Sequence, residues 1–328
     1  MIKVGLIGLG RFSIYHLQSI RQIPGVSITA VADLNPERVE SVQNEYGCAG
    51  YTDWRRMLEE EQLDAVTVLT PEHIHEEPVV TALQAGCHVF VEKPLAIDSE
   101  ACERMIAEAE KANKLLMVGH VCRFGIRQIE MKRTVDSGKL GNLRSIYGRR
   151  NNGSRYFPIY RRVDPVYILG IHDIDLMHWL SGSSVTEVFA HSSGPAEGGI
   201  DLQWAMLKFA SGMMGIVESS WLVPNGAPAE VDVRMEVVGE RGTVHFQEPD
   251  DGLAIWGDET TENGVLYDWQ PRYGRVAGAL LEELHHFYDC VRSGRKSDIL
   301  LPEDALAAVR VAEAVVLSCQ TGKPVLLG

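Results

Sequence analysis

A histidine and a carboxylate share one face of a predicted helix in the stretch GIHDIDLMHW, residues 170–179. His172 and Asp175 are one helical turn apart, so their side chains point to the same side. An imidazole beside a carboxylate suits general-base catalysis near neutral pH, because histidine titrates in that range. The same spacing also suits a His–Asp pair that only satisfies its own hydrogen bonds beneath a domain interface. His178 lies on another face of the helix and is expected to pack or to lie on the surface.

A lysine, Lys93, stands between the apolar run at 88–92 and Pro94. The residue before a proline is forced into an extended conformation, so a strand should end here. A lysine at that point can donate to a substrate hydroxyl and lower its pKa, or it can bind a phosphate. The plain alternative is a surface lysine at the end of a strand. The stretch TPEHIHEE at 70–77 follows the preceding apolar run in the same way, and open α/β sheets bind ligands at this edge.

Glycines interrupt and follow the first apolar run, VGLIGLGRF at 4–12. Gly8 would permit a tight turn after the strand, and Gly10 would let the backbone approach a pyrophosphate. That charge would face the N-terminus of a helix starting near Arg11. Ser13 is a small residue where this pattern usually has a third glycine. The pattern indicates a dinucleotide-binding turn, although glycine turns also follow strands that bind nothing.

The second apolar run ends in Asp33, 23 residues after Gly10. A carboxylate at this place accepts hydrogen bonds from the adenosine ribose hydroxyls and repels a 2′-phosphate. It favours NAD over NADP. Arg38 is the nearest arginine in the sequence that could hold such a phosphate. The alternative for Asp33 is a helix N-cap, which the stretch DLNPER also suits.

The histidines and cysteines do not form a metal-binding pattern. His73 and His75 are close in sequence but have no accompanying partner ligands, and the chain has no H-x-x-x-H or H-E-x-x-H motif. The six cysteines are scattered and include no Cys-x-x-Cys pair. We therefore predict no metal site, and a reducing compartment, the cytoplasm.

The charge of the chain narrows the classes of partner. The formal net charge is −14 over 328 residues, and such a balance repels nucleic-acid backbones and anionic lipid. No apolar stretch approaches the roughly 20 residues that span a membrane, and no signal-peptide pattern opens the chain. Neither a nucleic-acid nor a membrane partner is predicted.

The first third of the chain alternates short apolar runs with helical periodicity, which predicts a doubly wound parallel sheet. The predicted strands are 2–8, 27–33, 64–70, 88–94 and 115–120. The predicted helices are 11–22, 36–46, 53–60, 73–85 and 99–112.

Beyond residue 120 the pattern changes to strands without intervening helices, which predicts an α+β domain built on an open, mostly antiparallel sheet with helices on one face. The predicted strands are 142–152, 185–193, 202–210, 212–222, 233–240 and 242–248, with hairpin turns at ASG (210–212) and ERG (240–242). The predicted helices are 125–137, 172–180, 277–292 and 302–320. We expect a dinucleotide-binding domain at 1–121 and a substrate-binding and oligomerisation domain at 122–328, with helix 302–320 able to pack back on the first.

Taken together, these stretches resemble the Gfo/Idh/MocA oxidoreductase family from end to end. The matching pieces are GLIGLGRF (5–12), AD (32–33), LTPEHIH (69–75), AGCHVFVEKPLA (85–96), VGHVCRF (118–124), GKLGNLRSI (138–146), GIHDIDLMHWL (170–180) and EDALAAVRVAEAVVLSCQTGKPV (303–325). The resemblance implies a Rossmann domain followed by an open sheet that often builds the oligomer interface. A homo-oligomer, dimer or tetramer, is therefore expected through that sheet.

The same resemblance implies an NAD(P)-dependent oxidoreductase that moves a hydride between a nicotinamide cofactor and a secondary alcohol of a sugar, sugar derivative or cyclitol. Lys93 would orient the substrate, His172 would be the acid/base, and Asp175 would bind substrate hydroxyls. Predicted cofactor-binding residues are Gly8, Gly10, Arg11, Phe12, Asp33, Arg38, Thr70, Pro71, His75, Glu92 and Lys93. Predicted substrate-binding residues are His120, Cys122, Arg123, Asn152 and Tyr160.

One position departs from the family pattern. Many catalytic members carry an aspartate four residues before the histidine, and this chain has Ile168 there. The nearest upstream acid is Asp164, so His172 would rely on Asp175, or on Tyr160 or Tyr167. The departure keeps open a non-catalytic dinucleotide sensor, and the family resemblance also leaves open a glycosidase that retains its NAD.

Overall fold

The structure is a computed structural model that describes residues 1–249, 254–256, 261–263 and 271–328. The chain divides into two compact units, each with its own sheet. The first unit is Met1–Gly125 with Asp268–Leu306, and the second is Ile126–Tyr267 with Ala307–Gly328.

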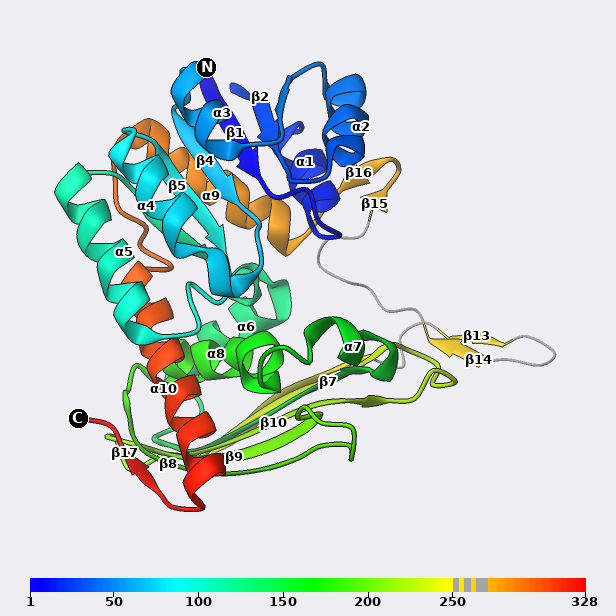
Figure 1. Ribbon diagram of the computed structural model, residues 1–328. Helices are drawn as coiled ribbons and strands as arrows, with labels where there is room; N and C mark the ends of the chain where they lie inside the picture. Colours follow the sequence, from blue (N-terminus) through cyan, green and yellow to red (C-terminus); the bar gives the residue numbers. More distant parts are fainter. Residues whose placement is uncertain (250–253, 257–260, 264–270) are drawn as a thin grey trace. The chain divides into compact units, whose positions relative to one another are not determined.

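The first unit contains a six-stranded parallel sheet in the order β3-β2-β1-β4-β5-β6 (Figure 1). Its strands are β1 (Ile2–Ile7), β2 (Val26–Ala32), β3 (Ala49–Tyr51), β4 (Ala65–Val68), β5 (His88–Glu92) and β6 (Leu116–Gly119). The order extends in both directions from β1, so the predicted doubly wound Rossmann sheet is confirmed. The sequence does not predict β3, because AGY is too short and carries no β-branched residue.

Helices connect these strands, and side chains define where several of them begin. They are α1 (Ser13–Ile20), α2 (Pro36–Tyr46), α3 (Trp54–Glu60), η1 (Glu72–Ile74), α4 (Glu76–Gln84), α5 (Ser99–Ala112), η2 (Val121–Phe124) and α9 (Ala279–Ser293), with the short pair β15 (Pro271–Arg272) and β16 (Arg275–Val276) before α9. The side chains of Asn35, Asp53 and Asp98 accept backbone N–H groups at the starts of α2, α3 and α5. These caps satisfy amide donors that have no partner inside the helix.

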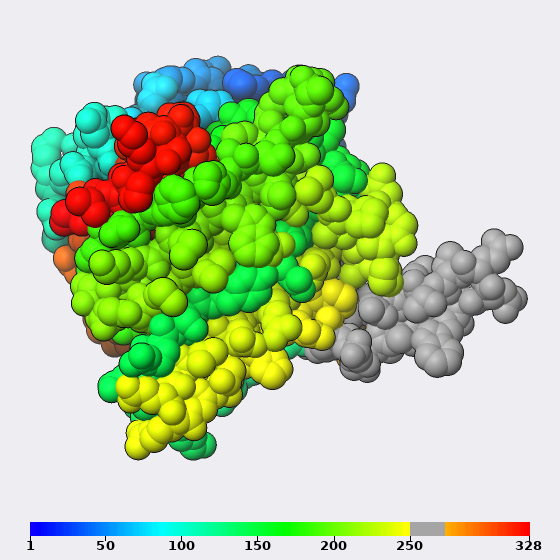
Figure 2. Space-filling view, turned by 90° about the horizontal axis from the view of Figure 1, so that it is seen from below, coloured from blue at the N-terminus to red at the C-terminus, as the bar shows by residue number. Residues whose placement is uncertain are grey.

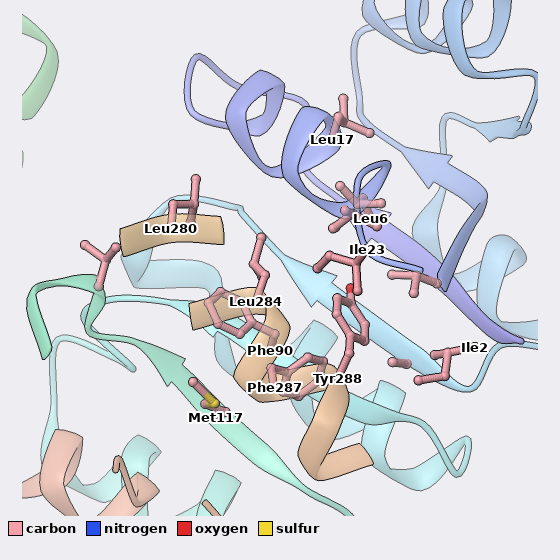
Figure 3. Close-up of a cluster of buried hydrophobic side chains, with 14 of the residues drawn as sticks. Ile2, Leu6, Leu17, Ile23, Phe90, Met117, Leu280, Leu284, Phe287 and Tyr288 are labelled. Carbon is pink, nitrogen blue, oxygen red and sulfur yellow. The ribbon is translucent and has the colours of Figure 1, made fainter. Parts of the chain in front are cut away.

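Helix α9 buries its apolar face against the parallel sheet. Leu284 and Phe287 are fully buried in the same cluster as Leu6 of β1 and Phe90 of β5 (Figure 3). The rings of Phe90 and Phe287 meet edge to face, with their centroids 5.6 Å apart. Aromatic side chains of this size contribute much of the free energy of a core.

This packing assigns α9 to the first unit. The predicted domain boundary after residue 121 places 277–292 in the second domain. In the structure, 268–306 belongs to the first unit. The reason is that α9 packs on the parallel sheet. Helical periodicity alone does not show which sheet a helix contacts. The last long helix, α10 (Pro302–Thr321), begins in the first unit and continues in the second, where Ser318 Oγ accepts the Ala190 N–H of β8 at 2.9 Å.

The Phe287→Ala variant is expected to lower the free energy of unfolding by about 3–5 kcal/mol, because a large buried ring leaves a cavity. Chemical denaturation of the Phe287→Ala variant and of wild type measures the difference. Glu282→Ala, on the exposed side of the same helix, is the matched control and should change stability by no more than about 0.5 kcal/mol. Equal losses in the two variants would contradict the assignment of Phe287 to the core.

The second unit contains a seven-stranded mixed sheet in the order β12-β11-β7-β10-β9-β8-β17. Its strands are β7 (Leu143–Gly153), β8 (Val185–Ser193), β9 (Leu202–Phe209), β10 (Met214–Val223), β11 (Val231–Gly239), β12 (Thr243–Glu248) and β17 (Val325–Leu326), and β13 (Ala254–Trp256) pairs separately with β14 (Thr261–Asn263). Only β7 and β10 run parallel within it. The predicted mostly antiparallel sheet and both hairpins are confirmed, while the two-residue β17 was not predicted.

Helices cover one face of this sheet. The unit contains α6 (Ile126–Asp136), η3 (Ser154–Tyr156), α7 (Phe157–Tyr160), the π-helix η4 (Val166–Gly170) and α8 (Ile171–Ser181). Gly148 of β7 allows α8 to lie close, since a Cβ there would be 2.9 Å from the Cβ of Asp173. On the opposite face Trp204, Met206 and Met214 are exposed. Figure 2 shows strands of this unit from below, in green and yellow.

Among the described residues, no helix is both long enough and apolar enough to cross a bilayer.

Candidate active site

The loop after β1 is shaped for a close backbone approach. Gly8 has φ +95°, and an added Cβ would lie 2.9 Å from the carbonyl of Leu69, so both conformation and space require glycine. A Cβ at Gly10 would meet no atom within 4 Å, which leaves that side of the loop open. Ser13 is buried, and its hydroxyl donates to the Gly10 carbonyl at 2.6 Å. A small third residue is therefore needed, as the sequence pattern predicts.

Asp33 is held against this loop by two backbone amides. Its Oδ2 accepts the Leu9 N–H at 2.7 Å, and its Oδ1 accepts the Asn35 N–H at 2.8 Å. Asn35 rather than Asp33 caps α2, so the N-cap alternative for Asp33 is wrong. Arg38 Nη1 lies 3.7 Å from Asp33 Oδ1 on a half-exposed side chain. The carboxylate stands beside the glycine turn, the position that suits ribose recognition and disfavours a 2′-phosphate.

The Asp33→Asn variant is expected to lower the preference for NAD over NADP at least about tenfold, since a hydrogen bond to a charged group is worth about 1.5–3 kcal/mol. Asparagine keeps an oxygen for the Leu9 amide while removing the charge. Values of kcat/KM with the two cofactors give the ratio. Glu40→Gln, on the exposed side of α2, serves as the control. An unchanged ratio in Asp33→Asn would remove Asp33 from cofactor selection.

His75 joins the loops that follow β4 and β5. It is buried, with Nε2 2.8 Å from the Thr70 carbonyl and Nδ1 3.0 Å from the Pro94 carbonyl. Burial lowers the pKa of His75, and the backbone carbonyls of Thr70, Leu95 and Pro94 oppose that shift. The His75 ring fixes the backbone on which Thr70 and Pro71 sit.

Within the described ranges no group of three or more His, Cys, Asp or Glu side chains could hold a metal ion.

Glu92 and Lys93 end the neighbouring strand, β5. The Lys93 N–H donates to Glu92 Oε2 at 3.2 Å, and the following Lys93–Pro94 peptide bond is cis. The first unit thus gathers Gly8, Asp33, Thr70 and Lys93 at the carboxyl ends of four adjacent parallel strands. This is the edge at which open α/β sheets bind their ligands.

Three predicted substrate residues lie at η2, in the first unit. His120 is buried and Cys122 half-buried. Arg123 is buried and donates to the Ile299 carbonyl at 2.8 Å and to Asp304 Oδ2 at 3.0 Å. These contacts tie η2 to the start of α10, and the roles of His120, Cys122 and Arg123 toward a substrate stay predictions.

In the second unit, His172 is the second residue of α8 and Asp175 follows one turn later, as predicted. His172 is half-buried and Asp175 buried. Asp173, between them, turns to β7 and forms a two-pronged ion pair with Arg150, at 3.0 and 3.1 Å. Complete burial raises the pKa of Asp173, and the Arg150 guanidinium opposes that shift. This pair fixes the rotation of α8, and with it the direction of His172.

The sequence did not reveal the Arg150–Asp173 pair. The contact between Arg150 and Asp173 depends on the register of β7 against α8. Asn152 lies two residues beyond Arg150 on the same side of β7, and its Oδ1 accepts the Gly153 N–H at 2.7 Å.

Ile168, at the position of the family aspartate, lies in an apolar and aromatic cluster. It packs with Leu169 and Trp221, and half-buried aromatic side chains surround them. Tyr160 stacks on Trp221 with ring centroids 5.1 Å apart and planes 3° from parallel. Asp164 accepts from Gln203 Nε2 at 2.9 Å, while burial raises its pKa. The Asp164 carboxylate is thus already hydrogen-bonded to a residue of β9.

The family assignment rests on both units. Residues 2–120 match the oxidoreductase family with an NAD-binding Rossmann fold, and residues 129–245 match the Gfo/Idh/MocA C-terminal domain. This chain belongs to the Gfo/Idh/MocA oxidoreductase family. The predicted family, the NAD cofactor and an oxidoreductase acting on CH–OH groups are confirmed.

Relatives match over nearly the full length. The chain is 29% identical to the scyllo-inositol 2-dehydrogenase (NAD(+)) of Bacillus subtilis strain 168, over 99% of this chain and 96% of that protein. It is 31% identical to inositol 2-dehydrogenase 4 of Saccharopolyspora erythraea, over 98% and 94%. The myo-inositol 2-dehydrogenase structure from Lactobacillus plantarum superposes with TM-score 0.87 at 23% identity, covering 100% of this chain and 99% of that one. The predicted fold class is confirmed.

Proposed function

We propose that this protein is a cyclitol dehydrogenase that oxidises one ring hydroxyl of an inositol-type polyol to a ketone with NAD. The main support is the full-length similarity to proteins named inositol 2-dehydrogenase, in a chain that keeps both Lys93 and His172. A cyclitol presents only hydroxyl groups, which suits recognition by the carboxylate of Asp175 and the amide of Asn152.

The residues of the first unit fit NAD. Gly8 and Gly10 form a turn with an open side, and the Asp33 carboxylate lies beside it. When bound, NAD supplies the acceptor for the hydride that leaves the carbon.

The proposed mechanism divides the remaining work between two residues. The Lys93 ammonium donates a hydrogen bond to the reacting hydroxyl oxygen and stabilises the negative charge that develops there. His172 accepts the hydroxyl proton as the C–H bond breaks, so that the alcohol loses one proton and one hydride. The proposal requires that both groups reach the same substrate oxygen.

The test is NADH formation by the purified protein with a panel of polyols. Absorbance is followed with scyllo-inositol, myo-inositol, glucose, a sugar acid and a nucleotide sugar. We expect the highest kcat/KM with an inositol. A glycosidase that retains its NAD would release product from a glycoside without net NADH, and a sensor would bind NAD but turn over nothing. Either result would replace the proposal.

We further propose a homo-oligomer formed through the uncovered face of the second-unit sheet. Trp204 and Met206 of β9 and Met214 of β10 are about half exposed on this face, and flat apolar sheet faces favour a partner. The neighbouring Arg149 and Asp232 form an ion pair at 2.7 Å within the same chain, so their charges are already paired when a second copy packs here.

A Trp204→Glu/Met206→Glu double variant is expected to shift the protein to monomer, because two charges would be buried at the contact. Sedimentation velocity measures the mass. Leu301→Glu, an exposed apolar position of the first unit, is the control and should keep the assembly. A wild-type monomer, or an unchanged assembly in the double variant, would contradict the interface.

A cytoplasmic location is also proposed, because the six cysteines are scattered along the sequence and include no Cys-x-x-Cys pair.

A further inference from the structure

A buried imidazole touches the residue beside Lys93. His16 of α1 is completely buried, and its Nε2 lies 3.0 Å from Glu92 Oε1 at the end of β5. The Glu92 side chain is also largely buried, with 15% of its surface exposed. A carboxylate removed from water in this way is stabilised by the donors that remain to it. His16 is therefore a principal partner of Glu92.

The same carboxylate holds the backbone of Lys93. Glu92 Oε2 accepts the Lys93 N–H at 3.2 Å, so the two oxygens of Glu92 face two different groups. Gly119 of β6 makes room for this arrangement, since a Cβ there would be 3.0 Å from Glu92 Oε1. A bulkier residue at 119 would push the carboxylate away from His16.

His16 also contacts the end of the glycine-containing loop after β1. Phe12, the residue that precedes α1, meets the His16 ring edge to face with centroids 5.3 Å apart. Phe90 of β5 also contacts the His16 ring, with centroids 5.6 Å apart. One imidazole thus connects the glycine turn and α1 to the strand end that carries Lys93.

We propose that His16 is a positioning residue that holds Glu92, and through Glu92 fixes the backbone that presents Lys93 to the substrate. The inference rests on the proposed dehydrogenase function. His16 does not itself reach the reacting atoms in this scheme. Its loss should lower kcat, because small displacements of a reacting group cost much of the rate, and should leave substrate KM and NAD affinity nearly unchanged.

Two substitutions separate positioning from packing. His16→Gln keeps an Nε2 donor that can reach Glu92, and His16→Leu fills similar space without a donor. We expect His16→Leu to lower kcat by about 10- to 100-fold, and His16→Gln to stay within about threefold of wild type. Leu17→Ala, on the same helix and buried in the core, controls for lost stability: its melting temperature should fall while its kcat holds.

Hydrogen exchange gives a readout that does not depend on turnover. In NAD-loaded protein, the Lys93 amide should exchange at least about tenfold faster in His16→Leu than in wild type, and at the wild-type rate in His16→Gln. Equal falls in kcat for both His16 variants, or unchanged exchange at Lys93 in His16→Leu, would overturn the inference. Altered exchange together with a wild type inactive on every polyol would instead overturn the proposed function alone.

Discussion

The Lys93→Met variant is expected to lose about 10²- to 10⁴-fold in kcat with an inositol substrate while still binding NAD. Methionine keeps much of the length of the side chain but has no charge and no donor. The alkoxide that develops as the hydride leaves then has no cation beside it. Cofactor binding relies mainly on the glycine turn and Asp33, which the substitution leaves in place.

Steady-state kinetics and a fluorescence titration with NAD separate the two effects. Lys114→Met, at a position that follows α5 in the same unit, is the matched control and should keep kcat within about twofold. A Lys93→Met enzyme with wild-type kcat would exclude Lys93 from the chemistry.

The His172→Ala variant is expected to lose a similar factor, about 10²- to 10⁴-fold, because no group then accepts the hydroxyl proton. The dependence on pH distinguishes this loss from a structural one. For wild type, kcat/KM should rise with pH as the base loses its proton, and in His172→Ala this rise should disappear.

The control is a second histidine of the same helix. His178 packs edge to face against Phe209, with ring centroids 5.9 Å apart, and His178→Gln should keep the pH profile of wild type. A His172→Ala profile that still rises with pH would assign the base to another residue. The tyrosines at 160 and 167 would then be the next groups to replace.

The sequence predicted the layout of the first unit because its signals are local. Each apolar run is followed by a segment with helical periodicity. Gly8 and Asp33 stand at turns from a strand to a helix, where such residues bind a ligand or cap the helix. The assignment of α9 could not be predicted, because its apolar face gives no indication of which sheet it covers. Leu284 and Phe287 decide this by packing on the parallel sheet.

Candidate site residues could be named from sequence motifs, but the contacts among side chains around them could not be predicted. Lys93 and His172 carry motifs, whereas the pair of His16 with Glu92 joins positions 76 residues apart and has no motif. A histidine placed one turn after Ser13, on the buried face of α1, was the available signal. Arg150 and Asp173 likewise meet only through the register of β7 beneath α8.

The departure at Ile168 becomes intelligible in the structure. Ile168 completes a cluster with Leu169 and Trp221, and a carboxylate there would be buried among apolar groups at considerable cost. The sequence shows the missing aspartate but not the aromatic surroundings, which come from β10 and from the segment before the π-helix. We expect Asp175, rather than an upstream acid, to be the carboxylate that assists His172.

A crystal structure of the protein with NAD and scyllo-inositol tests the central claim most directly. The claim predicts Lys93 Nζ and a ring nitrogen of His172 both within about 3.2 Å of a single hydroxyl oxygen of the ligand. A complex in which the two side chains contact different hydroxyls, or in which one of them points away from the ligand, would contradict it.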